Sequence, residues 1–237
     1  DEIYAEYLTA TQGMTWQKFR TLLKMLVNDA NNDGTPDDSV YGISHYEIET
    51  AVYSNNANFF TDDASEQRIT DPHFIEALQF IADLTLKDHV MVPAALQSEV
   101  DGFTRFLNSG CIFSFMGPWD CAQFWGYNIA FESNILPVPY NGENPDAMST
   151  AWVGSMGYCV SAKANSLQTA AAMRLAKYLC MNEDAQRKFY ELGQQVPNIV
   201  SMATDEYVND TKGLLEGKDP ADRSVWVDTI NGTSETD

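Results

Sequence analysis

Apolar residues at helical spacing mark several segments of the chain. After Thr15, large apolar side chains recur every three or four residues, and the same spacing follows Asp71-Pro72. A Thr or Asp before the first apolar residue is a typical N-cap, and Pro is favoured at the first helical position. Gly193, which follows the last strong pattern, is suited to end a helix. The pattern predicts helices over 15–27, 72–87, 166–179 and 183–192, with a weaker one at 225–230.

Continuous apolar runs predict strands between these helices. Residues 111–116 form an apolar run with one Ser, which is typical of a strand covered on both faces in an α/β sheet. One or two helical turns are predicted at 101–109 before it, with Gly110 in the left-handed position that ends a helix. Gly117-Pro118 ends the run, because Pro cannot donate to a ladder. Shorter strands are predicted at 41–43, 135–140 and 158–160. The alternation predicts an α/β fold with 111–116 as an interior strand.

The strand at 111–116 places Trp119 just beyond its carboxyl end. Open α/β sheets bind their ligands at this edge, so Trp119 is a candidate ligand-binding residue. The alternative is that Trp119 merely covers the core. Residues 53–58, which include Asn55, mix polar and aromatic side chains and are too polar to be core throughout.

An acidic loop at 29–40 follows the first predicted helix. Its oxygen-bearing residues alternate as in an EF-hand-type loop, and Gly34 permits the sharp turn that lets them converge. Val40 stands at the twelfth position, where an EF-hand carries a Glu, and Asp38 is expected to supply that carboxylate. The alternative is a solvated Asn/Asp turn without metal. The predicted ligands of a structural Ca²⁺ ion are Asp29, Asn31, Asp33, Asp37 and Asp38, together with the carbonyl of Thr35.

Composition narrows the classes of function. The 14 basic and 34 acidic side chains give a net charge of −20, which repels nucleic acid and anionic membranes. No phosphate-binding loop, GxSxG or HExxH motif is present, so we do not expect an enzyme. A glycosidase pair remains possible among the many carboxylates, but no pattern selects two of them. The four Cys residues are widely spaced without a CxxC pair, which argues against a metal cluster and leaves disulfide pairing open.

A series of weak motifs occurs in a fixed order along residues 14–202. It includes a TW-x-x-F helix start, a D-x-N-x-D-G loop and an F-x-x-G segment that ends in G-x-W. In order and spacing, the series resembles the family 1 extracellular solute-binding proteins of ABC importers, the group that includes maltose- and oligosaccharide-binding proteins. The segments that carry the resemblance are 15–19, 29–42, 59–60, 72–87, 106–119, 136–139, 154–161, 170–179, 185–189 and 193–197.

The resemblance implies a fold and a function. The fold is the class II periplasmic-binding-protein kind, a mixed sheet flanked by helices. The function is the extracytoplasmic substrate-binding component of an ABC importer, a cell-surface lipoprotein or periplasmic protein. It captures a sugar or oligosaccharide non-covalently between two lobes and delivers it to the permease transmembrane subunits, and a monomer is expected. The resemblance also implies that the calcium loop, seen in some members, is structural.

The same resemblance nominates ligand-binding residues. Trp119 matches the Trp that stacks on a bound sugar in maltose-type proteins, and Tyr46 lies near the offset of a second sugar-facing aromatic. Gly154 and Ser155 fall where the chain crosses between lobes. Stacking on sugar CH faces and hydrogen bonds to hydroxyls require no catalytic pKa tuning. The full candidate set is Trp119, Tyr46, Asp120, Trp152, Gly154, Ser155 and Asn55.

The position of the TW-x-x-F motif sets an expectation about domains. It comes at residue 15, so most of the first lobe, with any leader and lipid-anchoring Cys, is expected to be missing. Residues 1–153 would form the second lobe, 154–203 a crossover segment that belongs to the first lobe, and 204–237 a return to the second. We expect the chain to expose apolar surface around 158–160 and on the helices that follow. A carbohydrate-active enzyme and a calcium-stabilised structural module remain the alternative functions.

Overall fold

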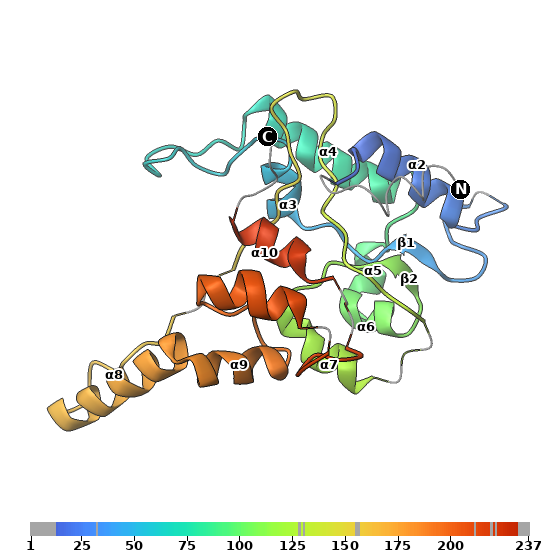
Figure 1. Ribbon diagram of the computed structural model, residues 1–237. Helices are drawn as coiled ribbons and strands as arrows, with labels where there is room; N and C mark the ends of the chain where they lie inside the picture. The colour runs from blue at the N-terminus through green and yellow to red at the C-terminus, as the bar shows by residue number, and fades with distance from the viewer. Residues whose placement is uncertain are drawn as a thin grey trace. The chain divides into compact units, whose positions relative to one another are not determined.

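The computed structural model describes residues 13–31, 33–127, 129, 131–154, 157–210, 212–218, 220 and 222–231 (Figure 1). The chain divides into two compact units. Unit 1 contains the described residues of 1–116 and 136–152, and unit 2 contains those of 117–135 and 153–231. Each unit therefore combines segments that are distant in the sequence. The assignment of segments to lobes stays a prediction.

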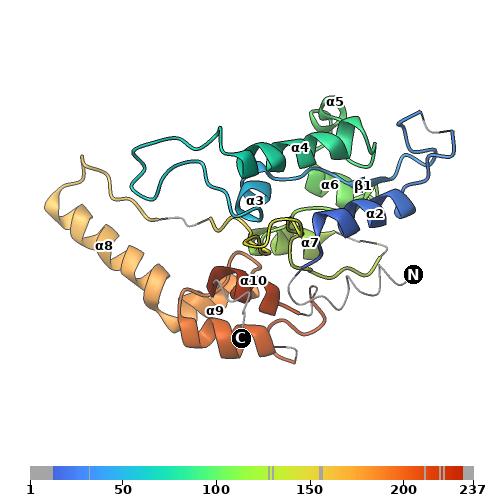
Figure 2. The same cartoon turned by 90° about the horizontal axis from the view of Figure 1, so that it is seen from above.

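Among its described residues, unit 1 contains five helices and two strands. Thr15 caps the first helix by accepting a hydrogen bond from the Lys18 N–H at 3.4 Å, and Asp71 caps the longest one through the His73 N–H at 2.9 Å. Both predicted helix starts are confirmed. The elements are α2 (Trp16–Leu26), β1 (Tyr41–Ile43), α3 (Ile48–Tyr53), α4 (Pro72–Leu86), α5 (Ala94–Gln97), α6 (Gly102–Leu107) and β2 (Cys111–Phe113). The short helix α3 packs beside the start of α4 (Figure 1 and Figure 2).

The strands β1 and β2 pair in parallel, with Tyr41 opposite Cys111 and Ile43 opposite Phe113. On the other side of β1, Ile43 forms a parallel bridge with Met91, so β1 has neighbours on both sides. The predicted strand at 41–43 is confirmed. The strand predicted over 111–116 ends early, at Phe113, because the chain leaves the ladder after the hydrogen bond from the Ser44 N–H to the Phe113 carbonyl (3.1 Å).

Three further sequence-based predictions are wrong. The segment 135–140 makes a single bridge, between Tyr140 and Thr15, because Pro137 and Pro139 cannot donate to a ladder. The described residues at 158–160 form no strand. The left-handed residue after α6 is Ser109, with φ of 60°, rather than Gly110.

Aromatic packing organises the core of unit 1. The indole of Trp16 on α2 stacks on the ring of Phe80 on α4, with centroids 4.2 Å apart and planes 5° from parallel. Phe19 meets Phe113 edge-on at 5.5 Å, which joins α2 to β2. Full burial of one such side chain contributes about 1.5–3 kcal/mol. The largest cluster of buried residues is Met14, Trp16, Phe19, Leu22, Leu23, Ile43, Tyr46, Ala51, Val52, Phe74, Ala77, Phe80, Leu84, Val90 and Met91.

Unit 2 is helical in its described part. Asn182 ends one helix and caps the next by accepting a hydrogen bond from the Ala185 N–H at 3.1 Å. Gly193, with φ of 67°, ends the second helix as predicted. A Cβ there would lie 2.6 Å from the Ala122 nitrogen, so only Gly fits. The elements are the 3₁₀ turn η1 (Pro118–Asp120), α7 (Cys121–Gly126), α8 (Ser166–Met181), α9 (Glu183–Glu191), the π-helix η2 (Met202–Tyr207) and α10 (Ser224–Asn231).

A carboxylate fixes η2 against α9. Glu206 accepts hydrogen bonds from Arg187 at 2.6 and 3.0 Å and from the Tyr190 hydroxyl at 2.7 Å. The Tyr190 ring also meets Tyr207 edge-on at 5.5 Å. These contacts hold η2 against α9, which carries charged side chains at five of its nine positions.

The cysteines are all free thiols: Cys111 and Cys121 are buried, Cys159 is exposed, and Cys180 is half-buried. Burial raises the pKa of both Cys111 and Cys121 to about 12, so these thiols are inert at neutral pH. Within the described residues, no helix is both long enough and apolar enough to cross a membrane.

A buried carboxylate joins α2 to the end of α4. The Asp88 side chain is 1% exposed and lies 2.5 Å from the Arg20 guanidinium and 2.7 Å from the Lys24 ammonium. Burial alone would raise the pKa of Asp88. The hydrogen bonds and charges of Arg20 and Lys24 outweigh burial and hold this pKa below its ordinary value. The stabilisation is therefore complete above the unfolded pKa near 3.8 and is lost as the pH falls through the lower folded pKa.

The substitution Asp88→Asn tests this contact. We expect it to lower the free energy of unfolding by about 1–3 kcal/mol at pH 7, because it removes the charge that Arg20 and Lys24 share. Urea denaturation measures the effect. The matched control is Lys87→Gln, which removes an exposed ion pair to Asp83 at 3.6 Å and should change the stability by less than about 0.5 kcal/mol. Equal effects of the two substitutions would contradict this account.

Candidate ligand-binding site

Polar side chains gather at the carboxyl ends of β1 and β2. Ser44 follows β1 and Ser114 follows β2, and their hydroxyl oxygens lie 3.0 Å apart. The Nδ1 atom of His45 lies 3.1 Å from the Ser44 hydroxyl. Sequence reasoning missed this cluster. The available signal was a Ser directly after each of two paired strands, at the edge where α/β sheets bind ligands.

The helix α6 and a glutamine side chain hold this cluster in place. Gln97 donates hydrogen bonds to the carbonyls of Ser44 (3.2 Å) and Val92 (2.7 Å). Gly102, at the start of α6, packs so closely that a Cβ there would lie 2.6 Å from the Nδ1 atom of His45. The imidazole is therefore fixed in position. Burial lowers the pKa of His45, and the charge of Asp101 opposes this only in part.

Tyr46, a predicted sugar-facing residue, lies in the core of unit 1. It is 5% exposed, and its hydroxyl donates a hydrogen bond to the Pro139 carbonyl at 3.1 Å. Its ring meets Phe80 and Phe115 edge-on, with centroids 5.0 and 4.9 Å away. The structure thus gives Tyr46 a packing role, and ligand contact by this residue stays a prediction.

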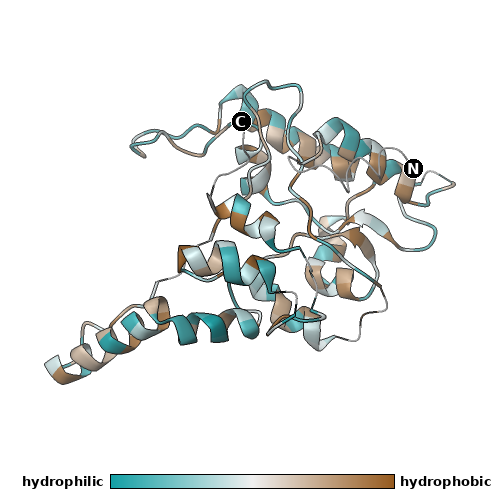
Figure 3. Cartoon of the chain, in the orientation of Figure 1, coloured by the Kyte–Doolittle hydropathy of each residue, from teal (hydrophilic) through white to brown (hydrophobic). Residues whose placement is uncertain are grey.

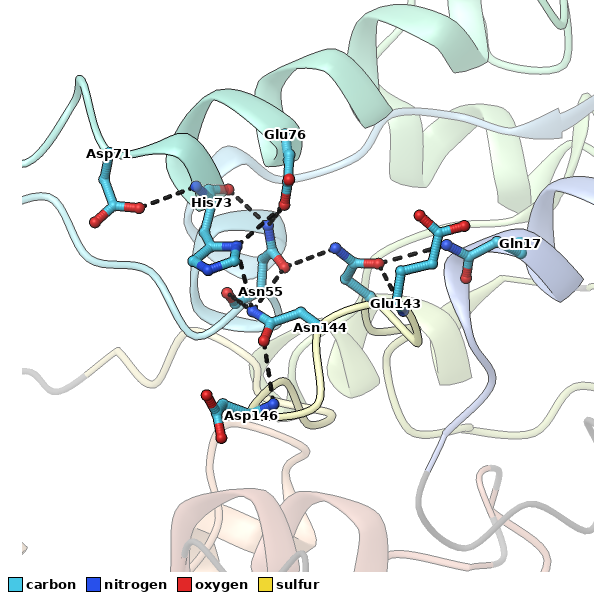
Figure 4. A network of polar contacts seen from close by, with 9 residues as sticks. Gln17, Asn55, Asp71, His73, Glu76, Glu143, Asn144 and Asp146 are labelled. Carbon is cyan, nitrogen blue, oxygen red and sulfur yellow. Dashed lines mark hydrogen bonds and ion pairs between the residues drawn. The ribbon is translucent and has the colours of Figure 1, made fainter.

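Asn55, a second predicted ligand residue, is fully buried within a polar network (Figure 4). Its amide nitrogen donates to the His73 carbonyl at 2.6 Å and to Glu76 at 3.1 Å. Its side-chain oxygen accepts from Asn141 at 2.8 Å and Asn144 at 3.2 Å. Both donors and both acceptor positions of the amide are therefore used inside unit 1. The position of Asn55 indicates a structural role, and its role toward a ligand stays a prediction.

Trp119 lies in η1 of unit 2 with half of its surface exposed. A Cβ on Gly117 would collide with the Trp119 indole, so the ring folds back over a residue that must be Gly. Asp120 completes the turn by accepting a hydrogen bond from the Gly117 N–H at 2.8 Å. The G-x-W motif therefore fixes a ring of which half remains exposed. An exposed aromatic surface of this kind can stack on an apolar ligand face.

The remaining predicted ligand residues lie where the chain passes from one unit to the next. Trp152, in unit 1, is 48% exposed, and Gly154, in unit 2, is exposed. Ser155 lies outside the described residues. The candidate set is thus divided between the two units, with Trp119, Asp120 and Gly154 in unit 2.

The acidic loop uses its side-chain oxygens on its own backbone. Asp29 accepts hydrogen bonds from the N–H groups of Asp33 (3.2 Å) and Gly34 (3.0 Å), and Asp37 accepts one from Ala30 (3.0 Å). The predicted ligands Asn31, Asp33 and Asp38 accept similar bonds, from the N–H groups of Asp33, Thr35 and Val40. In the described part of the chain, no three or more His, Cys, Asp or Glu side chains gather as a metal site. The predicted turn is confirmed, and its metal stays a prediction.

Comparison with known proteins decides the family. A family model for bacterial extracellular solute-binding proteins matches residues 3–215, which is most of the chain. The chain belongs to this family. The resemblance inferred from the ordered motifs is therefore confirmed. No curated protein matches the chain.

Several solved structures of solute-binding proteins share the fold of this chain. An ABC substrate-binding protein from Listeria monocytogenes in complex with cycloalternan has a TM-score of 0.72 and 18% identity, over 97% of this chain and 55% of that chain. The maltose/maltodextrin-binding domain MalE from Bdellovibrio bacteriovorus, bound to maltotriose, has a TM-score of 0.67 and 20% identity, over 96% and 56%. Maltose-bound MalE3 from T. maritima has a TM-score of 0.65 and 20% identity, over 97% and 57%. The chain spans little more than half of their length.

The cluster at the ends of β1 and β2 yields a prediction for pH. Because the folded state favours neutral His45, stability falls as the pH drops below the ordinary value of 6.5. We expect the wild type to lose more stability than His45→Gln between pH 7.5 and 5.5, by at most about 1.4 kcal/mol. Chemical denaturation at the two pH values measures this difference, and identical losses would contradict the assignment.

Proposed function

We propose that this chain forms part of the substrate-binding component of an ABC importer, and that the component captures a sugar or oligosaccharide outside the cytoplasm. The observation that carries the proposal is the family match over residues 3–215. Three of the solved structures that share the fold are described as bound to cycloalternan, maltotriose and maltose. A permease is the corresponding membrane partner, and the binding component acts without chemical conversion of its ligand. No specific observation favours the enzyme or the purely structural alternative.

In this proposal the complete protein has the class II fold with a mixed sheet, of which β1 and β2 are one parallel pair. Trp119 is the principal stacking residue, because its ring is held by η1 and remains half exposed. The hydroxyls of an oligosaccharide find carboxylate and amide partners readily on a chain with a net charge of −20, whereas an anionic ligand is repelled. A neutral sugar therefore suits the electrostatics better than a phosphorylated one.

The substitution Trp119→Ala tests this role in the product of the complete reading frame. We expect affinity for the cognate sugar to fall 30- to 1,000-fold, which corresponds to about 2–4 kcal/mol for a buried aromatic at a binding hot spot. Calorimetry against a panel of maltodextrins and cyclic glucans measures it. The matched control is Phe60→Ala. It removes a half-exposed aromatic side chain from unit 1 and should leave the affinity within twofold of the wild-type value. Unchanged affinity in Trp119→Ala would assign Trp119 to packing alone.

A second proposal concerns the loop at 29–40, which we expect to bind Ca²⁺ as a structural ion. The donor set fits a hard cation, because it consists of carboxylate, amide and carbonyl oxygens around a Gly with φ of 86°. Asp29, Asn31, Asp33, Asp37 and Asp38 would hold the ion together with the Thr35 carbonyl. The bound ion would add stability by neutralising these carboxylates.

Thermal unfolding with and without Ca²⁺ tests the loop. At 100 times Kd, the ion should stabilise the fold by about 2.7 kcal/mol, or about 5–10 °C in Tm. The double substitution Asp29→Asn with Asp33→Asn should abolish the shift. The control, Asp62→Asn with Asp63→Asn, alters another acidic turn in unit 1 and should preserve it. A Tm that responds to neither Ca²⁺ nor a chelator would refute the proposal.

A further inference from the structure

Trp119 is joined to α7 by continuous helical backbone. Asp120 has φ of −82° and ψ of −15°, and Cys121 has φ of −56° and ψ of −40°, so both lie in the right-handed helical region. The 3₁₀ turn η1 therefore continues directly into α7. A helix of only six residues is marginal in isolation. The position of α7, and with it that of Trp119, is therefore set by contacts with other parts of unit 2.

The turn that ends α9 packs directly on α7. The Ala122 N–H donates a hydrogen bond to the Gly193 carbonyl at 3.3 Å. A Cβ on Gly193 would lie 2.7 Å from the Trp125 indole and 2.9 Å from the Cβ of Cys121, so this turn and α7 are in close contact. Figure 3 shows that α9 is largely hydrophilic, so it offers little apolar surface to its neighbours. Specific contacts at its carboxyl end therefore connect it to α7.

Lys218 joins the same two elements through its ammonium group. Its Nζ atom lies 4.4 Å from the centroid of the Trp125 ring and donates a hydrogen bond to the carbonyl of Glu191, the last residue of α9, at 3.1 Å. A cation over an aromatic face is attracted by the ring quadrupole, and a cation near a helix C-terminus is favoured by the helix dipole. Lys218 is half-buried, which strengthens both interactions. One side chain thus bridges α7 and α9.

A buried arginine braces the turn that carries Lys218. Arg223 is 1% exposed, and its Nη2 atom donates hydrogen bonds to the carbonyls of Lys218 (2.7 Å) and Leu215 (3.5 Å). The Lys218 N–H also donates to the Leu215 carbonyl at 3.1 Å. The backbone at Lys218 is therefore fixed, which limits the positions that its ammonium group can take.

We propose that Lys218 is a positioning residue for ligand binding. It holds α7 in place, and through α7 it holds the ring of Trp119 in the orientation that stacks on the ligand. A ring that is already oriented loses less conformational entropy on binding than a ring that the ligand must order. Lys218 acts through Trp125 and the backbone of α7 and does not touch the ligand. This inference rests on the proposed role of Trp119, so its experiments are chosen to separate the two.

NMR spectra of the indole N–H groups test the orientation without any ligand. The product of the complete reading frame is labelled with ¹⁵N-tryptophan, and the spectrum of Trp119→Phe assigns the Trp119 cross-peak. We expect a single narrow Trp119 cross-peak in the wild type and a broadened or displaced one in Lys218→Met, which removes the charge but keeps an unbranched side chain. Lys218→Arg retains a cation and should restore the narrow cross-peak. The matched control Lys212→Met removes the charge of an exposed Lys from the same segment and should leave the cross-peak unchanged.

The affinity for the cognate sugar provides the second test. We expect Lys218→Met to weaken binding about 3- to 30-fold, because the ligand must then supply the free energy that the cation–π contact and the hydrogen bond supplied. In the Trp119→Ala protein the same substitution should change the affinity less than about twofold, since no ring remains to be positioned. Calorimetry measures the four Kd values, with high ligand concentrations for the weak variants. Urea denaturation verifies that each variant is folded under these conditions.

Several outcomes would overturn the proposal. An unchanged Trp119 cross-peak in Lys218→Met shows that Lys218 does not set the orientation of the ring. An affinity loss of the same size with and without Trp119 assigns Lys218 to direct ligand contact or to general stability. Normal affinity of Lys218→Met, together with weak binding by Trp119→Ala, refutes this inference alone. No binding by the wild type would contradict the proposed function instead, whereas the cross-peak still decides the orientation.

Discussion

The buried amide of Asn55 is the constraint on which the arrangement of unit 1 depends. An amide that loses its hydrogen bonds on burial costs about 1–3 kcal/mol, so each partner of Asn55 must be brought to it. Two partners lie at the start of α4, and the other two are Asn141 and Asn144. The segment 136–152 therefore returns to unit 1 after the chain has left it at Met116. The Pro139 carbonyl strengthens this return, because it accepts from both Trp16 (3.2 Å) and Tyr46 (3.1 Å).

The helices could be predicted from the sequence because their ends are determined locally. Thr15 and Asp71 cap helices through amides two or three residues away, and Gly193 ends α9 with a left-handed φ. The strands depend on partners elsewhere in the chain. The strand predicted over 111–116 stops at Phe113 because its ladder with β1 stops there, and the prolines at 137 and 139 prevent a strand that apolar composition had favoured.

The candidate site shows the same division between local and tertiary information. The G-x-W motif predicts a local geometry, in which Gly117 makes room for the indole of Trp119, and the structure has this geometry. The resemblance nominates Tyr46 as a ligand residue and a polar segment contains Asn55, yet each finds its hydrogen-bond partners inside unit 1. These hydrogen bonds depend on the path of the loop around 139–144, and nothing near Tyr46 or Asn55 in the sequence signals that path. Ser44 and Ser114 escaped prediction for a related reason, since their meeting depends on the pairing of β1 with β2, which are distant in the sequence.

The acidic loop illustrates how a fold tolerates concentrated negative charge. Asp29, Asp33, Asp37 and Asp38 lie within ten residues, and their mutual repulsion would open an unsupported turn. Backbone N–H groups offset it, because each of these carboxylates accepts at least one hydrogen bond from the loop itself. A carboxylate bound in this way still has lone pairs free for a cation. A metal ion would therefore tighten a turn that its own backbone already shapes.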